Sequence, residues 1–158
     1  MSVPTRMRRV ACMLFAALVV ASAAPVLAAE LSGAARNPPA LLIEHARARP
    51  TPPGVNVAAV YLRIVNAGGA DRLLRLSAPV AEQVQLHETR SEQGVMSMRQ
   101  LPFLDIPANG SIDAAPGGLH IMLRGLKAPL RNGDHFTLTL VFGEAGTLTA
   151  NVSVRADP

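Results

Sequence analysis

The chain has 158 residues, which is enough for one domain with a single hydrophobic core. Its formal net charge of +4 arises mostly at the N-terminus: apart from Arg6, Arg8 and Arg9, the chain carries 12 Lys and Arg against 11 Asp and Glu. This near balance excludes the basic face that a nucleic-acid-binding protein needs.

Residues 1–28 are typical of a secretory signal peptide. A positively charged start (TRMRR) precedes an apolar run (VACMLFAALVV), and small residues lead to Ala28, after which we expect cleavage. The alternative is a retained membrane anchor, because residues 10–29 are twenty uncharged residues, about enough to span a bilayer. Both interpretations predict a protein that is exported from the cytoplasm.

Cleavage of this segment would also remove the only cysteine, Cys12. A mature chain without cysteine forms no disulfide, offers no thiolate nucleophile and cannot build a cysteine-based metal site. The sequence also has no nucleophile elbow, phosphate loop or dinucleotide fingerprint. We therefore predict that the protein is not an enzyme.

Short strands are predicted along the rest of the chain. Residues 29–40 are expected to be a flexible tail, and the prolines of residues 48–54 form an extended loop or turn. A polar turn is expected at residues 89–94, and short strands and turns over residues 101–112. The main strands are expected at residues 41–43, 57–66, 72–76, 84–87, 95–101, 119–126, 135–142 and 147–154. Many short strands without a long helical period predict an all-β fold, an antiparallel β-sandwich or small barrel, with residues 41–158 as a single domain.

Histidine and methionine side chains gather between residues 87 and 122. The candidate metal ligands are His87, Met98, His120 and Met122, and all three methionines that follow the leader lie in this segment. In an extended strand, His120 and Met122 point to one side. Imidazole nitrogens and thioether sulfurs suit Cu(I), whereas zinc, calcium and magnesium have little use for a thioether. The residues therefore predict a Cu(I) site.

The sequence also allows other roles for the histidines and methionines. Met96 shares a strand face with Met98 and is a reserve ligand or a neighbour of the site. His45 and His135 are interpreted as surface residues. The alternative for the whole protein is a structural or adhesive secreted β-sandwich domain without metal function, in which the methionines fill space.

The order and spacing of His87, Met98, His120 and Met122 resemble the pattern H-x10-M-x21-H-x-M of the PCu(A)C family of periplasmic copper chaperones. The similarity extends over residues 41–154 and includes the segments RPTPPGVNVAAVYLRIVN and APGGLHIMLRGLKAPLRNGDHFTLTLVF. The resemblance implies a cupredoxin-like β-sandwich of Greek-key type, so that residues 41–158 would be the copper-binding domain. It also selects Met98 rather than Met96 as the ligand.

The same resemblance implies a role and partners. A PCu(A)C protein would deliver Cu(I) by ligand exchange in the periplasm, towards the Cu(A) centre of cytochrome c oxidase. The expected partners are cytochrome c oxidase subunit II and a Sco-like thioredoxin-fold protein. We expect a monomer that meets the membrane only through these partners.

Overall fold

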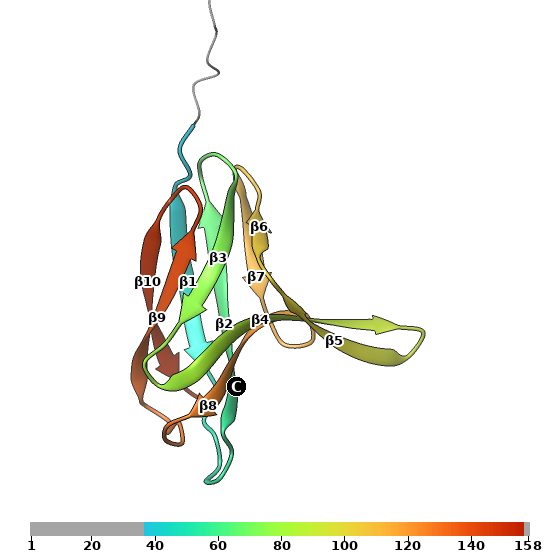
Figure 1. Cartoon of the computed structure of the whole chain (residues 1–158), viewed down its shortest axis with the longest axis vertical. Coiled ribbons are helices and arrows are strands. Elements are labelled where there is room, and N and C mark those ends of the chain that lie inside the picture. The colour runs from blue at the N-terminus through green and yellow to red at the C-terminus, as the bar shows by residue number, and fades with distance from the viewer. Residues whose placement is uncertain (1–36, 157–158) are drawn as a thin grey trace, which may run out of the picture. The chain divides into compact units, whose positions relative to one another are not determined.

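The computed structural model of the chain describes residues 37–156 (Figure 1). The predicted signal peptide, residues 1–28, and most of the predicted tail, residues 29–40, lie outside the described residues. Residues 37–156 belong to one compact unit and contain no helix that is long and apolar enough to cross a bilayer. The strands are β1 Leu41–Ala48, β2 Val57–Asn66, β3 Asp71–Ser77, β4 Ala81–Glu92, β5 Val95–Leu101, β6 Leu104–Ile106, β7 Gly110–Ala114, β8 Leu119–Leu126, β9 His135–Phe142 and β10 Thr147–Val154.

The strands are hydrogen-bonded in the order β5-β4-β8-β2-β1-β10-β9-β3-β6, and β7 also pairs with β2. The predicted all-β fold is confirmed. The strands are not entirely antiparallel, however, because β1 and β10 pair in parallel, with Arg47 opposite Ser153. A parallel pair needs a long connection between its strands, and here the whole length of chain from β2 to β9 provides it.

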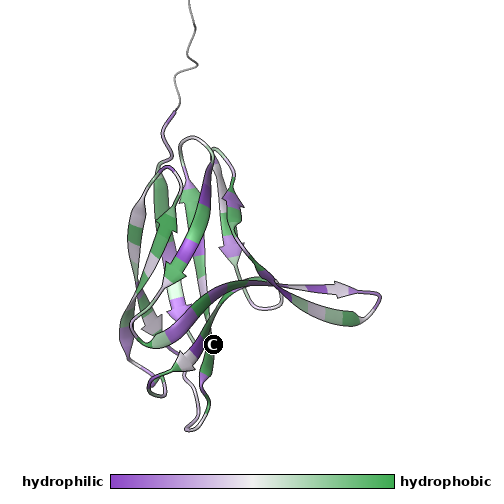
Figure 2. Cartoon of the chain, in the orientation of Figure 1, coloured by the Kyte–Doolittle hydropathy of each residue, from purple (hydrophilic) through white to green (hydrophobic). Residues whose placement is uncertain are grey.

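Alternating apolar residues build the core, as predicted for the last two strands. In β9, Phe136, Leu138, Leu140 and Phe142 are all buried. In Figure 2 hydrophobic residues recur along the strands of the sandwich. The same alternation positions the candidate site: Ile121 and Leu123 of β8 are 1% and 0% exposed in the core, so their neighbours lie on the opposite face.

β4 is longer than the sequence predicted. The expected turn over residues 89–94 is wrong: β4 continues to Glu92, opposite Val95 of β5, and only Gln93 and Gly94 form the loop. Both have positive φ angles, 51° and 81°, which suit a two-residue hairpin loop. Beyond Glu88 β4 leaves β8, and residues 89–98 extend from the other strands as a hairpin that we call the arm (Figure 1).

β1 is also longer than the predicted strand 41–43. Its pairing with β2 shifts between Glu44 and Arg47, and His45 in this β-bulge has a φ of 54°. His45 is exposed, and so is His135 at the start of β9, as predicted for both.

Asn66, at the end of β2, is the most buried polar residue between residues 37 and 156, with 1% of its surface exposed. Its side-chain oxygen accepts hydrogen bonds from the backbone N–H groups of Ala40 and Gly68, at 3.2 and 3.0 Å. Its side-chain nitrogen donates to the carbonyls of Gly69 and Pro107, at 2.6 and 2.9 Å. One side chain therefore joins the start of β1, the β2–β3 turn and the β6–β7 loop.

We predict that Asn66→Ala lowers the free energy of unfolding by about 3 kcal/mol, because several buried backbone groups lose their partners. The matched control is Asn151→Ala on the exposed face of β10, which should change stability by less than about 0.5 kcal/mol. Urea unfolding of the three proteins measures the difference, and equal losses in the two variants would contradict this role.

Candidate metal site

The pairing of β4 with β8 brings two of the candidate ligands together. His87 lies directly opposite His120 in this antiparallel register, and the centroids of their rings are 5.9 Å apart. The next pair on the same face is Gln85 with Met122. Two histidines that are far apart in the sequence therefore form one neighbouring pair.

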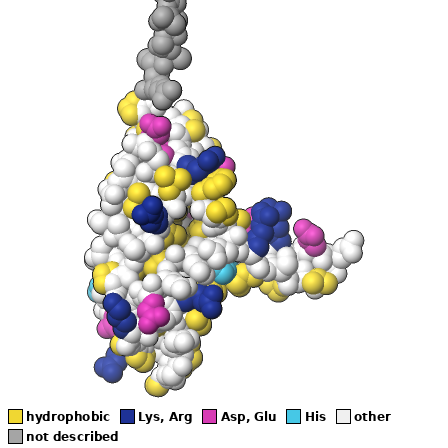
Figure 3. Space-filling model, in the orientation of Figure 1, with side chains coloured by type: hydrophobic (Ala, Val, Ile, Leu, Met, Phe, Trp, Pro, Cys, Tyr) yellow, Lys and Arg dark blue, Asp and Glu magenta, His cyan; other side chains and the backbone are white. Residues whose placement is uncertain are grey.

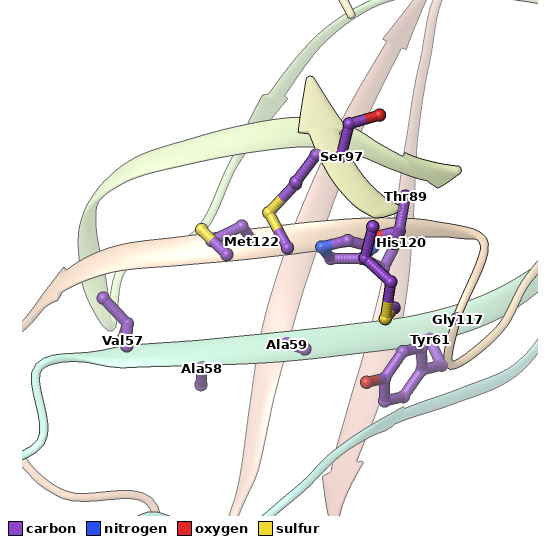
Figure 4. Close-up of a pocket in the computed structure, with 11 residues that line it drawn as sticks. Val57, Ala58, Ala59, Tyr61, Thr89, Ser97, Gly117, His120 and Met122 are labelled. Atoms are coloured by element: carbon purple, nitrogen blue, oxygen red, sulfur yellow. The ribbon is translucent and has the colours of Figure 1, made fainter. Parts of the chain in front are cut away.

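A pocket of about 520 Å³ opens beside this pair, between β2, β8 and the arm. Three of the four predicted ligands, Met98, His120 and Met122, line it, and so does Met96. His87 does not line the pocket and is placed beside His120 instead. Figure 4 shows His120 and Met122 projecting from β8 into this space, above the residues from β2. The remaining lining residues are Val57, Ala58, Ala59, Tyr61, Thr89, Ser97 and Gly117.

A hydrogen bond orients the imidazole of His120. Its Nδ1 lies 3.0 Å from the carbonyl oxygen of Gly118, in the turn before β8. A carbonyl only accepts, so Nδ1 carries the proton and the lone pair is on Nε2. His120 is 6% exposed, so the ring is held by packing as well as by this bond. Such an arrangement fixes the tautomer of a metal-binding histidine.

His87 has one nitrogen with a partner and one without. Its Nε2 lies 3.1 Å from Oε1 of Gln85, whereas Nδ1 is buried and has no hydrogen-bond partner among the described residues. Buried polar atoms nearly always have a partner, so an unpaired imidazole nitrogen next to a second histidine fits a metal ligand.

The surroundings of His87 favour its neutral form. Burial lowers the pKa of His87 below the usual value of 6.5, and the electrostatic influence of the nearby His120 and Arg124 lowers this pKa further. A histidine must be neutral to bind a metal, so this shift extends metal binding to lower pH.

The two methionines of the arm are both open to solvent. Met98, opposite Thr89, is 53% exposed, and Met96 is 69% exposed. Their predicted shared face is confirmed, because they are two residues apart in a strand that pairs with β4 without a break in register. Within residues 37–156, no three His, Cys, Asp or Glu side chains gather as metal ligands, so the candidate set consists of imidazoles and thioethers.

The apolar lining from β2 was not identified from the sequence. Val57, Ala59 and Tyr61 lie on the face of β2 opposite the buried residues Val60 and Leu62. That Val57, Ala59 and Tyr61 share a face could have been predicted from the sequence, since odd-numbered positions of a strand lie on one side. The sequence does not indicate that β8 lies next to β2, with Ala59 opposite Met122.

Comparison with known proteins identifies the family. The family model described as "Putative lipoprotein LpqE-like" matches residues 41–154. The chain belongs to the LpqE-like family, a PCuAC family. The predicted resemblance is therefore confirmed.

Two other proteins are similar to the chain in sequence. The chain is 36% identical over 104 residues to "Putative lipoprotein Lxx21020" of Leifsonia xyli subsp. xyli, a match that covers 65% of this chain and 63% of that protein. It is 34% identical over 106 residues to "Uncharacterized protein RP573" of Rickettsia prowazekii, covering 65% of this chain and 58% of that protein. The match thus spans less than two thirds of either relative.

Solved structures of PCuAC domains share the fold. The copper-bound PCuAC domain from PmoF2 is 28% identical and has a TM-score of 0.63, covering 74% of this chain and 93% of that domain. The solution structure of CuI-DR1885 from Deinococcus radiodurans is also 28% identical, with a TM-score of 0.61, and covers 78% of this chain and 83% of that protein. The predicted cupredoxin-like β-sandwich is confirmed by these likenesses.

We predict that the metal-free protein loses stability as the pH falls below about 6.5. The pKa of His87 is lower in the folded than in the unfolded chain, so the unfolded chain binds more protons in the window between the two values. The stabilisation is complete above the unfolded pKa and is lost as the pH approaches the folded one. Urea unfolding between pH ~7.5 and ~5 should show this decline in the wild type and a weaker one in His87→Gln. An equal decline in both proteins would contradict the assignment.

Proposed function

We propose that the protein binds one Cu(I) ion through His87, Met98, His120 and Met122 and carries it as cargo. The observation that supports this most strongly is the register that sets His87 opposite His120, beside a pocket lined by Met98 and Met122. Likeness to a copper-bound PCuAC domain and to a Cu(I) form of DR1885 supports the same ion.

The chemistry of the four side chains favours Cu(I) over other ions. Two imidazoles and two thioethers are soft or borderline ligands, and none of them carries a charge when bound. The pocket lining contains no Asp or Glu, so nothing there favours a hard divalent cation such as calcium or magnesium.

The open arm suits delivery of the ion rather than permanent storage. Met98 is 53% exposed, so an acceptor can approach the metal from the side of the arm without unfolding the sandwich. A cysteine thiolate of the acceptor would bond to Cu(I) as a thioether leaves, while copper stays in the same oxidation state and the thiol proton goes to solvent. Thiolate binds Cu(I) more strongly than thioether does, which drives the transfer.

The proposed delivery takes place outside the cytoplasm. The signal-like residues 1–28, the lipoprotein description of the family and the relative described as a lipoprotein support an extracytoplasmic, periplasmic protein. The acceptor would be the Cu(A) site of cytochrome c oxidase subunit II or a Sco-like thioredoxin-fold protein. The protein would act as a chaperone and not as an enzyme.

We predict that the purified mature chain binds one equivalent of Cu(I). X-ray absorption at the copper edge should show two nitrogen and two sulfur neighbours, as the imidazoles and thioethers require. A tenfold excess (roughly) of zinc should not displace the ion, because zinc has little affinity for thioethers. Absence of sulfur neighbours, or displacement by zinc, would instead favour a structural β-sandwich without copper function.

We also predict that Met98→Ile and Met122→Ile weaken Cu(I) binding without loss of the fold. Met122 projects from the body of the sheet, so its loss should lower the affinity roughly tenfold or more in a chelator competition assay. For the histidines, His120→Gln should weaken binding, and the matched control His135→Gln, on the exposed start of β9, should not. An unchanged affinity in both methionine variants would overturn the ligand assignment.

A further inference from the structure

We propose that Met96 and Met98 are interchangeable thioether ligands, so that the ion can move between them along the arm. This inference rests on the proposed function, because it concerns the same copper site. It adds a ligand that the family spacing does not select and a direction for the movement of the ion.

Met96 has no evident structural role. It is 69% exposed and lies opposite Ser91 on the arm, outside the core cluster. An exposed side chain buries little apolar surface and so contributes little to stability. Yet Met96 lines the same pocket as Met98, His120 and Met122. Its position is therefore that of a group that acts at the pocket.

The geometry of the arm lets either sulfur reach the same point. Residues i and i+2 of a strand lie on one face, about 6.8 Å apart along the strand. A methionine side chain has three rotatable bonds and adapts to irregular spaces, so the regions that the two sulfurs can reach overlap in the pocket and an ion can pass from one to the other. In Figure 4 the pocket lies between the β5 ribbon and the residues of β8.

Few contacts fix either thioether in one conformation. Among the described strands, β5 pairs with β4 alone and forms one end of the sheet. The ion pairs next to the methionines lie on the other face, where Arg90 and Arg99 are each 3.0 Å from Glu88. In Figure 3 charged side chains lie on the upper side of the projecting hairpin and hydrophobic side chains along its lower side. The methionine face is thus free of ion pairs.

The two methionines differ in their distance from the rest of the sheet. Met98 pairs with Thr89, next to the body, whereas Met96 pairs with Ser91, one step closer to the Gln93–Gly94 loop. With His120 and Met122 held on β8, exchange of Met98 for Met96 would move the ion outward. An acceptor that approaches the arm would meet the ion there.

The test is a double-mutant cycle with leucine, which resembles methionine in volume but has no sulfur. We expect Met96→Leu and Met98→Leu each to lower the Cu(I) affinity by no more than roughly threefold, because the other thioether takes over. The double variant should lose roughly thirtyfold or more, well beyond the product of the single effects. The matched control is Val95→Leu, which changes the arm without removing a thioether and should leave the affinity unchanged.

X-ray absorption on the same proteins counts the sulfur neighbours directly. The copper should keep two in each single variant and have one in the double variant. A copper ion with only one sulfur neighbour in Met98→Leu would overturn the interchange. So would a double variant whose loss of Cu(I) affinity equals the product of the two single losses. Both results would leave the copper function itself intact. Failure of the wild type to bind Cu(I) through sulfur would instead refute the proposed function itself. Circular dichroism of each variant confirms that the sandwich is folded.

Discussion

The candidate site depends on the register between β4 and β8. Leu86 and Ile121 face each other in the core at 6% and 1% exposure, and the next pair along, His87 with His120, lies on the opposite face of the sheet. Because successive side chains of a strand alternate, a slip of one residue would turn His87 into the core and expose Leu86. The burial of the apolar pair therefore opposes any other register. The core thus determines which ligands meet, although it contributes none of them.

The sequence predicted the strands in which β-forming residues lie between clear turn signals. β2, β5, β8, β9 and β10 have the predicted bounds, and in β9 and β10 burial of one face imposes a period of two. The prediction failed at residues 89–94, where no residue is needed in the core. That segment is a strand because it pairs with β5 across the two-residue Gln93–Gly94 loop, and its polar residues show no apolar alternation that would have marked a strand.

Part of the candidate site could also be predicted from the alternation of side chains along a strand. The shared face of His120 and Met122 followed from local alternation, and the likeness to a known family selected His87 and Met98. The pairing of His87 with His120 could not be derived, because β5, β6 and β7 intervene between their strands in the chain. The hydrogen bond from His120 to the carbonyl of Gly118 could not be predicted either, because it depends on the conformation of the turn before β8.

Tyr61 lies in the lining of the pocket, 8% exposed and with the guanidinium of Arg47 5.7 Å from its ring centre. It is the only tyrosine of the chain, which contains no tryptophan. Its ultraviolet fluorescence therefore comes from one known position at the site. Because Tyr61 lines the pocket, its fluorescence offers a way to follow events there without an added label or an engineered probe.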